Sequence, residues 1–236
     1  MRAWLRLLTG AGLVATLVLT AGCGRREAEP REARSFLPAA FGFRSAPPGA
    51  PAEAAAMRTP LAPGGICGVP GLVGERVAPI SGAQPGCGIE QPVQITQVAG
   101  LRLSQPAVLN CDAARALDGW VRESAIPVVG RKGGGLAGLE VAASYSCRTR
   151  NRQPGARLSE HARGRAIDIS AFTLANGSRL SVSEDWRGRH GRMMLALHSS
   201  ACGRFATVLG PESDAHHQSH FHFDVARHRG GGSYCR

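Results

Sequence analysis

Two short motifs that carry histidine and aspartate constrain this chain more than any other part of its sequence. The first motif spans residues 159–169, reads S-E-H-A-R-G-R-A-I-D-I and contains His161 and Asp168. The second lies about fifty residues later, at 220–224, and reads H-F-H-F-D. Imidazole nitrogen and carboxylate oxygen together form the mixed donor set that Zn²⁺ accepts in catalytic sites. A fold that uses both motifs must therefore bring them together around one metal site.

The second motif has the alternation of a β-strand. Side chains two residues apart in a strand share a face, so His220, His222 and Asp224 would point to one side. The two phenylalanines between them, and the valine that follows, would point into a core. The strand therefore places two histidines and a carboxylate beside the metal site.

The first motif differs from an amphipathic helix, because Gly164 interrupts it and residues 166–172 alternate and include β-branched side chains. We expect His161 in a loop and Asp168 in a strand, with these two residues and His222 as the metal ligands. The alternative for each motif alone is a surface histidine near an aspartate, or a buried strand that mixes histidine with aromatic residues.

These motifs carry a family resemblance. The pattern S-E-H-x-x-G-x-A-x-D-I followed by H-x-H resembles the zinc proteins that include the D-Ala-D-Ala carboxypeptidases, lysostaphin and hedgehog. Residues 67–236 as a whole resemble the bacterial extensin-like C-terminal domain. The resemblance implies one Zn²⁺ held by His161, Asp168 and His222, with an open fourth position for water. His220 would act as the base, and Asp224 would orient His222 or His220 without binding the metal itself.

A further segment, residues 144–149 (S-Y-S-C-R-T), resembles the S-x-Y-R-S element of those carboxypeptidases, whose arginine contacts the substrate. By this resemblance Arg148 would bind a substrate carboxylate or a developing oxyanion. The carboxypeptidases have a glutamate three residues before the last zinc histidine, where this chain has Ser219. The H-x-H arrangement is closer to that of the murein endopeptidases, so both kinds of peptidase stay open.

The N-terminal residues 1–23 have the composition of an export signal. Arg2 and Arg6 precede an apolar run at 13–19, and small residues precede Cys23, as in a bacterial lipoprotein signal. The apolar run is shorter than the roughly 20 residues that span a bilayer. We therefore expect Cys23 to be lipidated, which would anchor the protein to the outer or inner membrane on its periplasmic side.

Residues 24–63 are rich in alanine, proline, arginine and glutamate and predict a flexible tether, and residues 64–236 are long enough for one domain with a core. An even number of cysteines in an exported domain favours disulfides over metal thiolates. Fifteen pairings of six cysteines are possible, so we expect three bridges without assigning them. The six are Cys67, Cys87, Cys111, Cys147, Cys202 and Cys235.

Periodic patterns predict an α+β domain, with a small, mainly antiparallel sheet and packed helices. Strand and turn are expected over 91–103, a helix over 110–125 that Asn110 caps, and an alternating strand over 139–147. Asn176-Gly177 predicts a hairpin, and 192–205 predicts a second helix. The resemblance implies a fold of the hedgehog and D-Ala-D-Ala-peptidase type.

The net charge of +11 comes almost entirely from arginine, since Lys132 is the single lysine. No basic run interleaved with aromatic residues is present, so the sequence favours no nucleic-acid partner. His216 and His217 precede the second motif and could approach the metal or a substrate, although a solvated loop is the simpler reading. The sequence gives His190, His198 and His228 no partner, so we expect them on the surface.

Two functions from different classes follow. The first is an exported zinc metallopeptidase that cuts peptide bonds in peptidoglycan stem peptides or cross-links, with the peptidoglycan peptide as its partner. The second is a wall-binding or structural lipoprotein that keeps zinc for folding alone, as the hedgehog resemblance allows.

Overall fold

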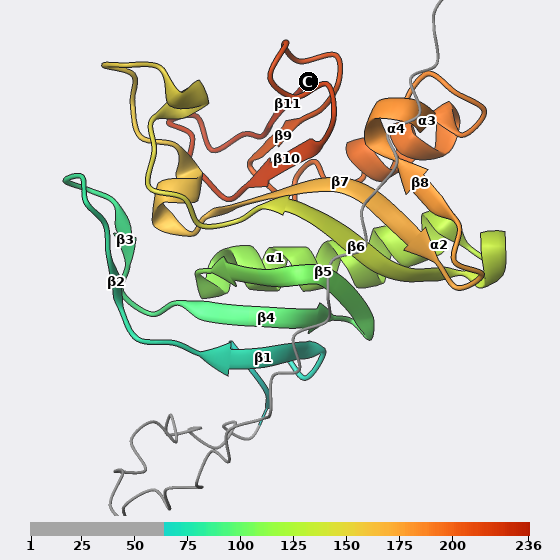
Figure 1. The fold of residues 1–236 in the computed structure, drawn as a ribbon, viewed down its shortest axis with the longest axis horizontal. Helices are drawn as coiled ribbons and strands as arrows, with labels where there is room; N and C mark the ends of the chain where they lie inside the picture. The colour runs from blue at the N-terminus through green and yellow to red at the C-terminus, as the bar shows by residue number, and fades with distance from the viewer. Residues whose placement is uncertain (1–63) are drawn as a thin grey trace, which may run out of the picture. The chain divides into compact units, whose positions relative to one another are not determined.

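The computed structural model describes residues 64–236 (Figure 1). The predicted signal at 1–23 with its lipidation site Cys23, and the predicted tether at 24–63, lie outside the described residues. Within 64–236, none of the helices has the length and apolar character needed to cross a bilayer.

Most strands form one nine-stranded sheet, ordered β1-β4-β5-β6-β7-β10-β9-β11, with β8 paired to β7. Its members are β1 (Leu72–Arg76), β4 (Val93–Val98), β5 (Leu101–Leu109), β6 (Leu136–Ala143), β7 (Ala166–Leu174), β8 (Arg179–Ser181), β9 (Thr207–Leu209), β10 (Phe221–Asp224) and β11 (Tyr234–Cys235). A separate hairpin joins β2 (Ile80–Ser81) to β3 (Gly88–Ile89).

The domain is α+β, as expected, and the described sheet is mixed, with six antiparallel pairings and two parallel ones that were not expected. β5 pairs parallel with β6, and β11 pairs parallel with β9. The first parallel pair is joined by a helical crossover, because two parallel neighbours cannot be connected by a tight turn. A β-α-β unit is therefore built into the domain.

That crossover is one helical segment in three parts: α1 (Cys111–Trp120), the π-helical turn η1 (Val121–Ala125) and α2 (Ile126–Val129). Asn110 caps it as expected, since its side chain accepts a hydrogen bond from the Ala113 amide at 2.9 Å. The segment continues beyond the predicted end at residue 125. The wider turn lies directly before Pro127, which has no N–H to donate to an α-helical ladder.

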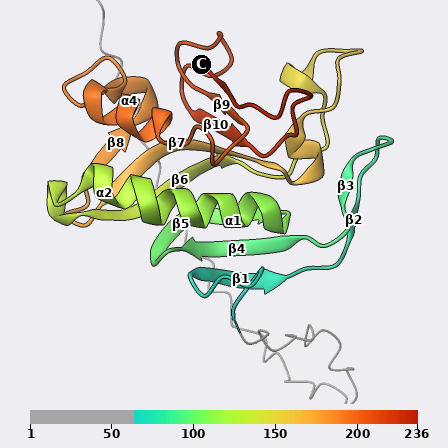
Figure 2. The ribbon, with the colours of Figure 1, turned by 180° about the vertical axis from the view of Figure 1, so that it is seen from behind.

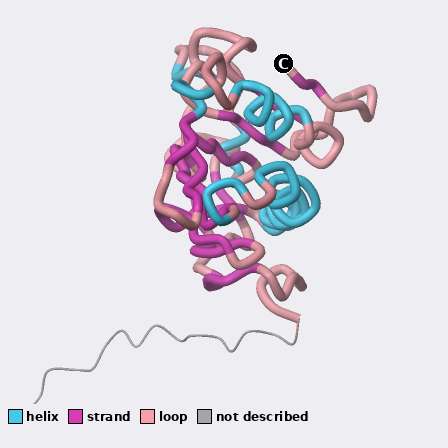
Figure 3. The backbone as a smooth tube through the Cα atoms, turned by 90° about the vertical axis from the view of Figure 1, so that its right-hand side faces the viewer, coloured by secondary structure: helices cyan, strands magenta, loops and turns pink. Residues whose placement is uncertain are grey.

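The core lies on the face of the sheet that the helices cover. Figure 3 shows the strands edge-on with α1 on one side, and Figure 2 shows α1 in front of the sheet. Trp120 of α1 packs edge-on against Phe223 of β10, with ring centroids 5.0 Å apart, and Phe205 stacks on Phe223 at 5.0 Å. All three side chains are fully buried. The phenylalanines of β10 thus point into the core, as their alternation predicts.

The remaining elements depart from expectation at their ends. The hairpin around Asn176-Gly177 is present, between β7 and β8. The strand expected over 139–147 ends at Ala143, because the chain beyond it turns to meet the first motif. The helix expected over 192–205 is α4 (Gly191–Ser199), preceded by the short α3 (Val182–Asp185). Short 3₁₀ turns complete the description: η2 (Lys132–Gly134), η3 (Arg150–Arg152) and η4 (Glu160–Arg163).

The six cysteines of the domain form three disulfides, as expected. Cys67 pairs with Cys111, Cys87 with Cys147, and Cys202 with Cys235. The second bridge ties the segment before β3 to the chain between β6 and η3, and the third holds the C-terminal strand against the end of α4. Each bridge therefore secures a loop or an end of the described domain.

Candidate metal centre

The two motifs meet on neighbouring strands. β7 and β10 pair antiparallel in a register that sets Asp168 directly opposite His222, and Ala143 of β6 lies opposite Asp168 on the other side. Directly opposed residues share a face of the sheet. Because Phe221 and Phe223 point into the core, His222 and Asp224 point to the opposite face, where Asp168 joins them.

His161 comes from η4, the turn that leads into β7. Ser159 caps this turn, since its hydroxyl accepts a hydrogen bond from the His161 amide at 3.4 Å. Gly164 ends the turn in a left-handed conformation with φ of 62°. A Cβ at that position would lie 2.2 Å from the Ile89 side chain, so glycine is required for both conformation and space. The turn directs the His161 ring back toward Asp168.

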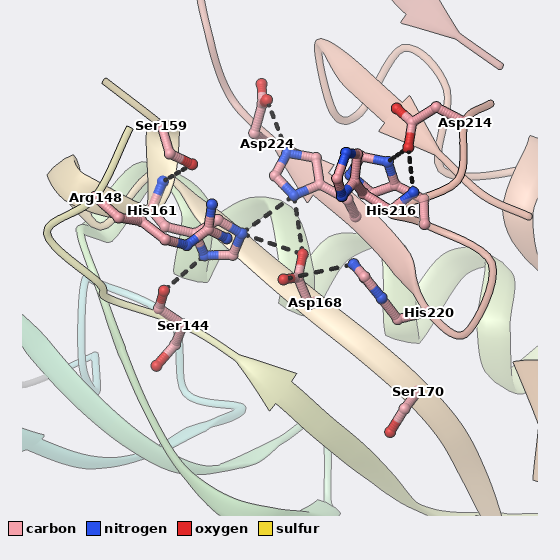
Figure 4. Close-up of polar contacts among 12 residues, drawn as sticks. Ser144, Arg148, Ser159, His161, Asp168, Ser170, Asp214, His216, His220 and Asp224 are labelled. Carbon is pink, nitrogen blue, oxygen red and sulfur yellow. Dashed lines mark hydrogen bonds and ion pairs between the residues drawn. The ribbon is translucent and has the colours of Figure 1, made fainter. Parts of the chain in front are cut away.

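Three donor atoms converge in this way (Figure 4). His161 Nε2 lies 3.1 Å from Asp168 Oδ1 and 3.2 Å from His222 Nδ1, and His222 Nδ1 lies 2.9 Å from Asp168 Oδ1. Tetrahedral ligands about 2.0 Å from Zn²⁺ are separated by about 3.3 Å. The donor set and its spacing therefore suit one zinc ion, and the three side chains, all buried, form a group that could hold a metal.

The outer contacts of the histidines decide which nitrogens face the centre. His161 Nδ1 lies 2.6 Å from the Ser144 carbonyl oxygen, and His222 Nε2 lies 3.1 Å from Asp224 Oδ2. A carbonyl or carboxylate only accepts, so each of these nitrogens carries the proton and donates it. The opposite nitrogens then present lone pairs to Asp168. Three electron-rich atoms in a buried space require a cation or a proton between them.

The titration behaviour of the cluster fits this requirement. Burial opposes protonation of His222, but hydrogen bonds to Asp168 and Asp224 outweigh burial and raise its pKa to about 9. Burial would raise the pKa of Asp168, yet the two imidazoles bring it well below its usual range. A proton on His222 is one way to satisfy the three acceptors, and a divalent cation is another.

The predicted base His220 lies just outside the cluster, with its Nε2 3.7 Å from Asp168 Oδ2. Burial lowers its pKa, although Asp168 opposes the shift. A second histidine, His217, also enters the site: its ring is 5.3 Å from that of His220 and 5.6 Å from that of His222. His217 is buried, and its Nδ1 donates to Asp214 Oδ1 at 2.8 Å.

His217 therefore approaches the site, as one of the two alternatives allowed, and His216 is exposed to solvent where it lines the same cleft as His217. The spacing Asp214-x-x-His217 was visible in the sequence, but nothing local indicates that this loop folds inward. The expected surface position is wrong for His198, which is 6% exposed and packs against Trp186 and Phe221. His190 is half-buried beside Asp185, and His228 is exposed as expected.

One cleft of about 680 Å³ contains the candidate site. The three candidate ligands, His217, His220 and Asp224 line this cleft, and Arg148 adds a cation. Arg148 is half-buried, and its Nη1 donates to the neighbouring Thr149 carbonyl at 3.5 Å. Ser219, which precedes His222 by three residues, is exposed. The structure thus brings every residue of the predicted site into one cleft.

Comparison with known proteins places the chain in a family. No curated protein and no solved structure matches it. A family model does: the one described as "Extensin-like protein C-terminus" matches residues 71–236, which covers nearly all of the described domain. The chain therefore belongs to the extensin-like protein C-terminus family.

Proposed function

We propose that this protein is an exported zinc metallopeptidase that hydrolyses peptide bonds of peptidoglycan stem peptides or cross-links. The observation that carries the proposal is the convergence of His161 Nε2, Asp168 Oδ1 and His222 Nδ1 in a cleft with two further histidines. The motif resemblance to zinc peptidases supports the same activity. A site that served folding alone would need no open cleft beside it.

Zn²⁺ held by these three ligands would supply Lewis acidity to polarise a substrate carbonyl. The residues around it have separate tasks. His220 accepts a proton from the attacking water and returns it to the leaving amine. Arg148 binds a substrate carboxylate or the developing oxyanion with its planar guanidinium. Asp224 and the Ser144 carbonyl hold the tautomers of His222 and His161 that face the centre.

The test is hydrolysis of purified muropeptides, with products analysed by mass, in the presence of zinc and of a chelator. Alanine at His161, Asp168 or His222 should abolish zinc binding. His220→Ala should keep zinc, since it leaves all three ligands, while hydrolysis falls by roughly 10²–10⁴-fold. Loss of zinc from His220→Ala would make His220 a ligand. Zinc binding without cleavage of any wall peptide would favour the alternative, a wall-binding or structural lipoprotein.

We also propose that the protein is anchored to a membrane and faces the periplasm. This proposal rests on the sequence of residues 1–23 alone. Cys23→Ser should lose a lipid label and fractionate as a soluble protein, and unchanged membrane retention would refute the anchor.

A further inference from the structure

The wall of the cleft beside Arg148 carries an excess of arginine. Residues 148–165 contain six arginines and a single acidic residue, Glu160. Glu160 is engaged by Arg163 and Arg165, each with a nitrogen 3.7 Å from one of its oxygens. Within residues 64–236, no carboxylate forms an ion pair with the three arginines that line the cleft. These three are Arg148, Arg150 and Arg152.

Arg150 and Arg152 are exposed on a turn whose backbone is unusual. Asn151 (φ 52°) and Arg152 (φ 58°) are consecutive left-handed residues, and neither is glycine. Such conformations are unfavourable for side-chain-bearing residues, persist only where the surroundings impose them, and gather at ligand sites. The turn η3 therefore has a specific backbone conformation, which costs most at Arg152 and which sets where the chain presents Arg150 and Arg152.

Several contacts impose this arrangement. Thr149 Oγ1 donates to the Gln153 carbonyl at 2.7 Å, and the Arg150 amide donates to the Arg157 carbonyl at 2.9 Å. Cys147, just before Arg148, is bonded to Cys87. In Figures 1 and 2 this segment and the loops around β9 and β11 lie at the top of the view, beyond β7. The backbone that carries Arg150 and Arg152 is therefore held beside the cleft, and within residues 64–236 neither guanidinium is paired with a carboxylate.

We propose that Arg150 and Arg152 form a second carboxylate-binding subsite, beyond Arg148, that selects peptides carrying at least two carboxylates. The proposal rests on the proposed peptidase function and names its substrate class. A guanidinium matches a carboxylate with two parallel N–H donors, which a neutral amide cannot replace. Because Arg148, Arg150 and Arg152 line the same cleft as the three candidate metal ligands, a peptide whose scissile bond lies at those ligands can also contact the turn.

Binding tests the subsite separately from cleavage. The probes are a synthetic stem tetrapeptide with free carboxylates and the same peptide with its carboxylates amidated. Fluorescence anisotropy is measured on the purified chain, and again with chelator so that hydrolysis cannot deplete the probe. The acidic peptide should bind at least tenfold more tightly than the amidated one. Arg150→Gln and Arg152→Gln should each weaken binding of the acidic peptide about three- to tenfold at low ionic strength.

Two controls separate geometry from net charge. Arg192→Gln removes the same charge from α4, outside the cleft, and should leave the preference unchanged. Asn151→Pro keeps the charge but fixes φ near −65°, so it should reduce the preference as the arginine variants do, whereas Asn151→Gly should retain it.

Equal affinity of the wild-type chain for both peptides, or an equal loss in Arg192→Gln, would overturn the subsite. If both peptides are cleaved and are bound with equal affinity, the carboxylate subsite is refuted and the peptidase function is supported. If the acidic peptide is bound more tightly and neither peptide is cleaved, the subsite is supported and the peptidase function is refuted.

Discussion

The Asp224 carboxylate, which accepts a hydrogen bond from His222, allows a quantitative test of the candidate metal centre. Asp224 Oδ2 accepts from His222 Nε2 at 3.1 Å, and both side chains are buried, at 4% and 8% exposure. A hydrogen bond to a charged group contributes about 1.5–3 kcal/mol. Asp224→Asn keeps an acceptor oxygen but removes the charge that makes the imidazole a better donor to the metal. We expect zinc affinity to fall about 10–100-fold, equivalent to about 1.4–2.7 kcal/mol.

The assay is competition for zinc against a chromophoric chelator, with circular dichroism to confirm folding. Asp185→Asn is a matched control, because Asp185 also contacts a histidine: it accepts a hydrogen bond from His190 Nδ1 at 2.8 Å. Its second oxygen accepts from the backbone amide of Ser181. It lies outside the cleft lining and should leave zinc affinity unchanged. Affinity of Asp224→Asn within threefold of wild type would show that Asp224 does not tune His222.

Three further predictions concern protons, packing and disulfides. Because the pKa of His222 is raised to about 9 without metal, zinc binding below that pH should release one proton, and zinc affinity should rise about tenfold per pH unit between pH 6.5 and 8.5. Calorimetry in two buffers would count the released proton, and a count of zero would exclude competition between zinc and the proton. Phe223→Ala should lower the free energy of unfolding by about 3–5 kcal/mol in urea titration, and a loss under 1 would contradict the packing seen. Thiol titration of the denatured, unreduced domain should find almost no free sulfhydryl, and the double serine variant at Cys87 and Cys147 should lose about 2–4 kcal/mol of stability.

The features of the fold and of the site that depend on neighbouring residues could be predicted from sequence. Alternation over 220–224 identified which side chains leave the core, and a short polar side chain before an apolar helical pattern identified Asn110 as a cap. Both depend only on neighbours along the chain. The inward fold of His217 depends on the loop that carries Asp214, and its burial is a tertiary property that no local pattern encodes.

The mixed sheet was missed for an identifiable reason. Strand and turn were expected over 91–103, whereas β5 runs from Leu101 to Leu109 and includes Pro106, a residue that usually interrupts strands. The strand, helix and strand that follow one another over 101–143 were therefore not recognised as a β-α-β unit, which implies parallel pairing. The disulfide pairing could not be predicted, since cysteines 33 to 60 residues apart leave no local trace of their partners.

The two faces of the short strand β10 have different roles, since one packs into the core and the other lines the cleft. This limits which insertions and deletions the strand can tolerate. Deleting one residue between His220 and Asp224 would turn the phenylalanines toward the cleft and the ligands into the core, so metal and packing would be lost together. A change of two residues would restore both faces but shift His222 away from Asp168. Relatives that lack the proposed metal site are therefore expected to differ by single substitutions of the candidate ligands, with the length of this strand unchanged.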